Sequence, residues 1–206
     1  MKNSARQTQK ENTREKIVKA ACAEFSARGI LGTRMSDVAQ AAHVSHGTVF
    51  LHFKTQEELV TEVIGAYAGK MAARMHELAR SATTLREILA AHLAGIAEFE
   101  ALYTRLALEA RLLPEPCRSA WIGIQSAISL HLNQAAEQEM RAGRLKPMPA
   151  HFLFNAWSAL VQYYLVNGDL FAPDGSVIGR CGSELVDQFI RLVSVDNGNT
   201  YKEVQS

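Results

Sequence analysis

The residues with the most evident binding chemistry lie close together, between Thr33 and Leu59. This stretch supplies hydroxyl, imidazole, amide and cationic groups that can bond phosphate oxygens or base edges. It also contains a glycine, which lets the backbone approach a partner closely. The candidate contact residues are Thr33, Arg34, Ser36, Ser45, His46, Gly47, Thr48, Phe50, Leu51, His52, Lys54 and Gln56. Their combination favours contact with a DNA duplex.

Helical periodicity divides the second short helix of this stretch into two faces. Val49 and Phe53 are four residues apart, so they face the same way and can pack inward. Gly47, Thr48 and Leu51 then point outward, where Thr48 can bond a phosphate or a base edge. An outward leucine is unusual on a solvated surface but suits contact with a thymine methyl group. The pattern predicts a recognition helix, and the alternative is a three-helix packing unit without a DNA role.

This stretch resembles the N-terminal head of TetR-family regulators over residues 13–64. The family pattern has a Thr, then Asp-Ile-Ala, Ala-Gly-Val-Ser and Gly-Thr-Leu-Tyr, and finally a His and a Phe. The matching residues here are Thr33, Asp37-Val38-Ala39, Ala42-His43-Val44-Ser45, Gly47-Thr48-Val49-Phe50, His52 and Phe53. The resemblance implies a helix-turn-helix head on a helical body that dimerises and senses a ligand.

Three positions depart from the family pattern. His43 replaces the usual turn glycine, so we expect a histidine in the left-handed region. Phe50 replaces a tyrosine and loses one hydroxyl that could bond phosphate. Gln56 replaces a lysine that touches phosphate in the family, and Lys54 is its expected substitute.

The body has candidate pocket residues that combine large apolar surfaces with polar tips. They are His92, Phe99, Tyr103, Trp121, Gln125, Phe154, Trp157 and Tyr163. An ordinary packed core explains the same residues, and His92 is then a core histidine with satisfied hydrogen bonds. The pair His43 and His46 has no cysteine or carboxylate at metal-ligand spacing, so we expect no metal site. No catalytic motif is found in the sequence, so we expect neither an enzyme nor a cofactor.

Apolar periodicity and turn residues predict an all-α protein with about nine helices. Residues 1–11, with Lys2, Arg6 and Lys10, are expected to form a flexible basic arm, and the first helix to start near Thr13 and close at Gly29. Residues 12–72 form the predicted DNA-binding domain (the head), and residues 73–206 the effector-binding and dimerisation domain (the body). After the first helix, the predicted helices of the head are 36–42, 46–53 and one that starts at Thr55. The predicted helices of the body are 85–112, 118–142, 150–166 and 177–194.

The net charge of +1 conceals an asymmetry along the chain. Residues 1–54 hold nine Lys and Arg against four acids, whereas the remainder holds 13 bases and 17 acids. A basic head suits a polyanionic partner such as DNA. No transmembrane or secretory segment is recognisable, and the three cysteines form no paired motif. We therefore expect a cytoplasmic protein with no membrane partner.

These observations favour a sequence-specific repressor that leaves a palindromic operator when a small apolar or amphipathic ligand binds the body. From the resemblance we expect a homodimer joined through residues 150–166 and 177–194, with a ligand-driven tilt of the fourth helix changing the spacing of the heads. One alternative is a DNA-bound scaffold that recruits proteins without a small-molecule pocket. Another is an all-helical enzyme with an incidental head.

Overall fold

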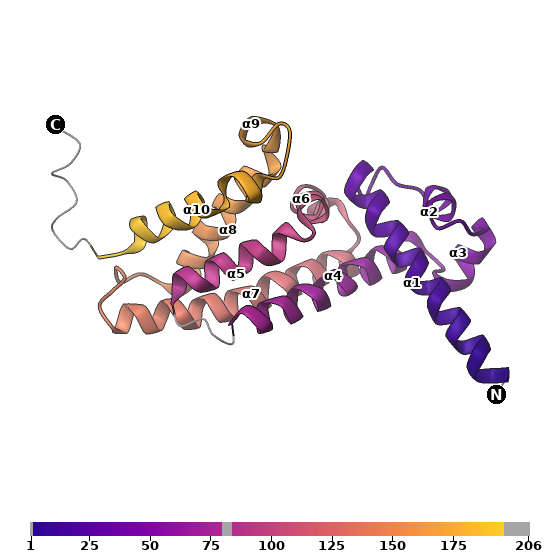
Figure 1. Ribbon diagram of the computed structural model, residues 1–206, viewed down its shortest axis with the longest axis horizontal. Coiled ribbons are helices and arrows are strands. Elements are labelled where there is room, and N and C mark those ends of the chain that lie inside the picture. The colour runs from indigo at the N-terminus through magenta and orange to yellow at the C-terminus, as the bar shows by residue number, and fades with distance from the viewer. Residues whose placement is uncertain (1, 80–83, 196–206) are drawn as a thin grey trace. The chain divides into compact units, whose positions relative to one another are not determined.

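The computed structural model describes residues 2–79 and 84–195, and it confirms the predicted all-α class (Figure 1). The described residues form ten α-helices and one 3-10 turn, Ala110–Leu112, and they contain no strand. The α-helices are α1 Lys2–Arg28, α2 Met35–Ala41, α3 His46–His52, α4 Gln56–Ala79, α5 Leu85–Ala97, α6 Glu100–Glu109, α7 Glu115–Arg141, α8 Ala150–Val166, α9 Gly168–Phe171 and α10 Val177–Val193. No helix in the described ranges is long and apolar enough to cross a membrane.

The chain divides into two compact units, with boundaries that differ from the predicted ones. The first unit combines the chain through Ala73 with Phe99–Gln125, and the second combines Arg74–Glu98 with the chain from Ser126. The predicted head is thus joined by α6 and the start of α7, which lie far away in the sequence. Periodicity along one helix carries no information about which distant helix will cover it, so the sequence did not predict this grouping.

Helix α1 extends further toward the N-terminus than predicted. It starts at Lys2 rather than near Thr13, so residues 2–11 are helical and not a flexible arm. The segment is rich in residues with high helix propensity, and the Gln7 amide donates to the Glu11 carboxylate at 2.8 Å, one turn away. The Thr13 hydroxyl donates to the Gln9 carbonyl at 2.9 Å, as expected inside a helix rather than at an N-cap. Arg6 and Lys10 are exposed, and the side chain of Lys2 lies outside the described residues.

In the body, the helix boundaries agree with the prediction to within one residue except at three places. The single helix predicted over 85–112 is interrupted after Ala97, so α5 and α6 are separate helices. The loop predicted between the last two helices contains the short α9, which raises the helix count above nine. Helix α7 starts at Glu115, ahead of the predicted Arg118. Proline is tolerated in the first turn of a helix, which explains why Pro116 lies inside α7.

The second unit is built around α10, which packs against α5 and α8. One face of α10 is buried through Val177, Leu185, Phe189 and Val193, at helical spacing. The N-terminus of α10 is capped by Ser176, whose hydroxyl accepts from the Gly179 amide at 2.8 Å. At the other end, Lys146 donates its amide hydrogen to the Val193 carbonyl at 2.8 Å. These contacts hold the last helix against the segment that precedes α8.

Candidate DNA interface

The turn between α2 and α3 has the geometry that the sequence predicts. His43 has a φ of 52°, so a histidine occupies the left-handed region where the family usually has glycine. The Val44 amide donates to the Ala39 carbonyl at 3.0 Å, which closes the turn. Ser45 caps α3, because its hydroxyl accepts from the Thr48 amide at 3.1 Å. The start of α3 is therefore fixed by local hydrogen bonds.

The predicted facing of α3 is confirmed. Val49 and Phe53 are buried, with 0% and 2% of their surface exposed, whereas Leu51 is 73% exposed. Gly47 is exposed, and Thr48 is half-buried beside the capping serine. The helix is thus anchored on one side and presents a mixed apolar and polar surface on the other. This is the arrangement that a helix in the major groove requires.

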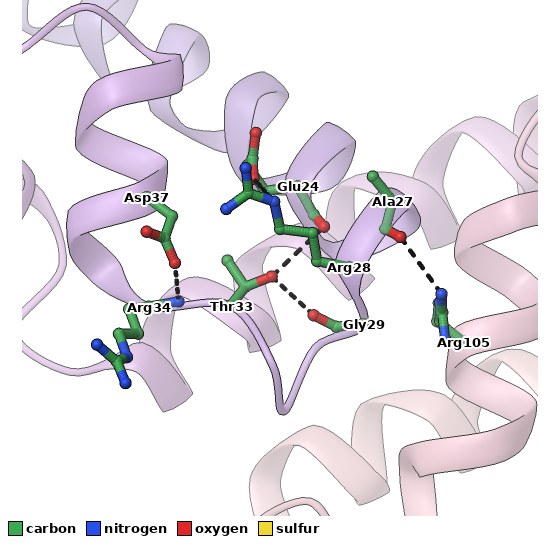
Figure 2. Close-up of polar contacts among 8 residues, drawn as sticks. All are labelled: Glu24, Ala27, Arg28, Gly29, Thr33, Arg34, Asp37 and Arg105. Carbon is green, nitrogen blue, oxygen red and sulfur yellow. Dashed lines mark hydrogen bonds and ion pairs between the residues drawn. The ribbon is translucent and has the colours of Figure 1, made fainter.

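Several other predicted contact residues lie on the accessible surface of the head. Arg34, Ser36, Ser45, His46 and Lys54 are exposed. Phe50 is half-buried, and its ring and that of His46 pack edge to face with the ring centres 4.8 Å apart. This ring contact restrains the Phe50 side chain, which lacks the hydroxyl of the usual tyrosine. Arg34 stands immediately before α2, where its amide donates to the Asp37 carboxylate at 2.9 Å (Figure 2).

Thr33 does not have the position expected of a DNA contact. Only 2% of its surface is exposed, and its hydroxyl donates to the Gly29 carbonyl at 2.7 Å (Figure 2). Gln56 also differs from the prediction, because its amide nitrogen donates to the carbonyls of Ile30 and Thr33 at 3.2 and 2.9 Å. Both side chains hold the loop between α1 and α2, so we withdraw them from the set of contacts. The sequence motif alone does not distinguish a residue that touches DNA from one that supports the loop.

His52 is half-buried beside cationic groups. Burial lowers the pKa of its imidazole, and the positive charges of Lys10 and Arg14 lower that pKa further. Its Nδ1 atom has no hydrogen-bond partner in the described structure. Arg14 itself pairs with Glu62 of α4, and its guanidinium lies over the Phe53 ring at 4.8 Å from the ring centre. His52 therefore offers a neutral imidazole at the edge of the recognition helix.

Helix α6 supports the end of α1 and the loop between α1 and α2 within the first unit. The sequence did not predict this support. The Glu109 carboxylate accepts from the Leu31 amide at 2.8 Å. The Arg105 guanidinium donates to the Ala27 carbonyl, in the last turn of α1, at 3.3 Å (Figure 2). Gly29 has a φ of +89°, and a Cβ added there would lie 2.6 Å from a Glu109 oxygen. The positive φ favours glycine at this turn, whereas the Glu109 carboxylate, at the end of a flexible side chain, would have to shift to admit a Cβ.

The predicted pocket residues are found in two separate clusters, one in each unit. In the first unit, the Tyr103 and Trp121 rings meet edge to face at 5.1 Å, and the Gln125 amide donates to the Tyr103 hydroxyl at 3.3 Å. Phe99 belongs to the same unit and meets the Tyr67 ring at 5.3 Å. These aromatic groups belong to α4, α6 and the start of α7, within the first unit.

In the second unit, His92 and Trp157 are completely buried and hydrogen-bonded to each other. The Trp157 indole nitrogen donates to the His92 Nδ1 atom at 3.0 Å. Phe154 is 8% exposed and contributes to the same buried face of α8. Tyr163 is 57% exposed, so it lines no interior site, and its assignment to the pocket was wrong. The prediction grouped these residues by their chemistry, whereas α8 places Tyr163 on the side opposite its buried face.

Among the described residues, no group of three or more His, Cys, Asp or Glu side chains could hold a metal ion.

Comparison with known proteins agrees with this geometry. Residues 17–63 match the family described as bacterial regulatory proteins, tetR family. The HTH-type transcriptional repressor KstR2 of Mycolicibacterium smegmatis is 29% identical over 98 residues, which is 48% of this chain and 47% of that protein. The match thus spans about half the length of this curated relative.

Solved structures share the fold over most of the chain. A TetR-family transcriptional regulator from Agrobacterium tumefaciens aligns with a TM-score of 0.75 and 18% identity, covering 90% of this chain and 100% of that one. FadR of Bacillus subtilis, in complex with stearoyl-CoA, aligns with a TM-score of 0.71 and 17% identity, covering 85% of this chain and 97% of that one. Residues 17–63 therefore match the TetR family of bacterial regulatory proteins, and the described residues share the fold of a solved TetR-family regulator.

Proposed function

We propose that the protein is a dimeric, ligand-responsive repressor that binds a palindromic operator in cytoplasmic DNA. The observation that carries the proposal is the two-sided α3, with Val49 buried, Leu51 exposed and Ser45 capping the N-terminus. A capped helix end offers amide hydrogens and a favourable dipole to phosphate, and the exposed face can read base edges. The basic N-terminal quarter of the chain adds attraction for the phosphate backbone.

The proposed dimer forms through α8 and α10, which have exposed apolar residues; those of α8 lie opposite its buried face. These residues are Phe152, Tyr163, Val166 and Leu192. Large exposed apolar side chains on two helices favour a self-complementary interface between identical chains. A dimer holds two recognition helices, which must match half-sites about 34–36 Å apart. The operator is then palindromic.

The proposed response to ligand passes through α6. Tyr103 lies in the aromatic cluster of the first unit. On the same helix, Glu109 holds the loop that precedes α2, and Arg105 holds the last turn of α1. A ligand that displaces α6 would therefore move the head directly, in addition to any tilt of α4. The complex of FadR with stearoyl-CoA supports an apolar or amphipathic effector for this fold. Ligand can shift the population of DNA-binding conformers only by its difference in affinity for them.

Selection of an operator from random DNA, followed by comparison of two variants, tests the proposal. Leu51→Ala should fold normally and lose discrimination at one base pair, by about 1–3 kcal/mol. Val49→Ala should instead lower the free energy of unfolding by roughly 1–3 kcal/mol, because it opens a cavity beneath α3. Melting temperatures and binding to single-base operator variants distinguish the two effects. A selected site without two-fold symmetry, or a stably monomeric protein, would contradict the proposal.

A further inference from the structure

The hydrogen bond between Trp157 and His92 determines which nitrogen of the imidazole carries the proton. An indole nitrogen can only donate, so the His92 Nδ1 atom must accept and is therefore unprotonated. Burial lowers the pKa of His92 to about 4, which keeps the ring neutral at physiological pH. In a neutral ring with an unprotonated Nδ1, the single ring hydrogen is on Nε2. His92 therefore offers one N–H donor at a defined position.

This donor has no partner. Nε2 of His92 forms no hydrogen bond in the described structure. The whole residue is 0% exposed, so bulk water does not reach this atom. A buried donor without an acceptor is unfavourable, and such groups are rare in folded proteins. The cost is tolerated where a ligand supplies the missing acceptor. The orphaned donor thus indicates an acceptor that is not part of the chain.

The surroundings indicate the chemistry of that acceptor. The helices that pack together here, α5, α8 and α10, bury mainly apolar side chains, among them Leu89, Ile96, Val161 and Phe189. Among the described residues of the second unit, Glu139 is the one charged side chain that is buried, and it already accepts from the Leu85 amide at 3.1 Å. No buried cation is present in this described region to balance an anion. A neutral oxygen on an apolar molecule is therefore favoured over a carboxylate.

We propose that the Nε2–H group of His92 donates a hydrogen bond to a neutral carbonyl oxygen of an otherwise apolar effector, with Trp157 orienting the imidazole. This inference rests on the proposed ligand-responsive function and specifies the recognition group. His92 then selects carbonyl compounds over hydrocarbons of the same shape, because only the carbonyl satisfies the donor. Trp157 acts as a positioning residue, since it holds the imidazole in the required tautomer.

Two substitutions separate the two nitrogens of His92. In His92→Asn, the shorter amide can still accept from Trp157 but does not reach the position of Nε2. In His92→Gln, the longer amide places an N–H near that position. Trp157→Phe keeps an aromatic ring beside Phe189, whose ring centre lies 5.1 Å from that of Trp157, but removes the indole donor. Thermal unfolding without any ligand establishes first that each variant is folded.

The probes are matched pairs of a ketone and its hydrocarbon: benzophenone with diphenylmethane, camphor with bornane, and methyl nonyl ketone with undecane. Binding of each probe to the full-length protein is measured by titration calorimetry and by the shift in unfolding temperature. In at least one pair, the wild-type protein should prefer the ketone by about tenfold, as expected for one buried hydrogen bond. His92→Asn should abolish this preference, and His92→Gln should retain part of it.

Nitrogen NMR of the histidine rings gives a second readout that needs no ligand. The wild-type protein should show the Nε2–H tautomer for His92, and Trp157→Phe should relax it toward a mixture. A predominant Nδ1–H form, an equal affinity for ketone and hydrocarbon in every pair, or a tightly held water at Nε2 would overturn the proposal. Operator binding is measured separately with the selected DNA. Loss of the ketone preference with intact operator binding rejects only the role of His92, whereas failure to bind any operator rejects the proposed function.

Discussion

In the first unit, the buried hydroxyl of Thr33 donates to the Gly29 carbonyl at 2.7 Å, whereas the buried hydroxyl of Ser158 in the second unit has no partner. The described residues include four buried polar or charged side chains, of which Thr33 belongs to the first unit. His92, Glu139 and Ser158 belong to the second, and two of these three leave a polar atom unpaired. Among the fully buried polar side chains the two units thus differ, although the half-buried His52 of the first unit also has an Nδ1 atom without a partner.

The difference agrees with DNA recognition by the first unit and with the effector contact that we propose for His92 in the second. Recognition of DNA requires a loop and a helix of defined shape, and the paired hydroxyl of Thr33 and the amide of Gln56 stabilise that shape. Binding of an effector requires donors whose acceptors come from outside the chain, as we propose for His92. Changes to single polar groups should therefore have opposite consequences for stability in the two units.

The largest expected effect is a loss of stability in acid caused by His92. Its pKa is about 4 in the folded protein against a usual value of 6.5, so the unfolded chain binds the proton at higher pH. The stability contributed by the neutral imidazole is fully present above pH 6.5 and falls as the pH drops from 6.5 toward 4. The full loss is of order 3 kcal/mol. Denaturant unfolding across this range measures it.

His92→Asn is the matched control for the acid titration, because it removes the titrating ring and keeps a partner for Trp157. The difference between wild type and variant cancels the contributions of other groups, including Glu62, whose pKa is lowered mainly by its hydrogen bond to Arg14. Parallel pH profiles for the two proteins would mean that His92 takes up its proton as readily in the folded state as in the unfolded state, with the same pKa in both. The contrast between the two units would then lose its main support.

Thr33→Val should have the second-largest effect, in the first unit. The substitution keeps the shape of the side chain but leaves the buried Gly29 carbonyl without its donor, so the free energy of unfolding should fall by about 1–3 kcal/mol. Urea unfolding measures this change. Ser36→Ala is the control, because Ser36 is exposed on the neighbouring α2 and should change stability by less than about 0.5 kcal/mol. Equal stabilities of the Thr33 variant and wild type would show that the loop does not depend on this bond.

Ser158→Ala should have the smallest effect and the opposite sign. Because the hydroxyl has no partner, its removal should leave the free energy of unfolding unchanged or raise it by up to about 1 kcal/mol. The same urea experiment on the ligand-free protein provides the comparison with Thr33→Val. A clear destabilisation would indicate that Ser158 has an acceptor, and the second unit would then resemble the first.

Local sequence determined much of this protein. The spacing of Val49 and Phe53 predicted the facing of α3, and the left-handed turns at Gly29 and His43 followed from the motif and the turn residues. The bounds of α8 were predicted as the structure has them. These features depend on side-chain period, capping and φ preferences within a few residues, which explains why they can be predicted without a tertiary structure.

Only the tertiary structure decided what each polar side chain does. Thr33 and Gln56 belong to the contact motif by type, but the packing of α1, α2 and α4 directs their hydrogen bonds into the loop. His92 and Trp157 are 65 residues apart, and Leu31 and Glu109 are 78 apart. A hydrogen bond depends on distance and direction between atoms, and residues so far apart acquire both only when the helices that carry them have packed.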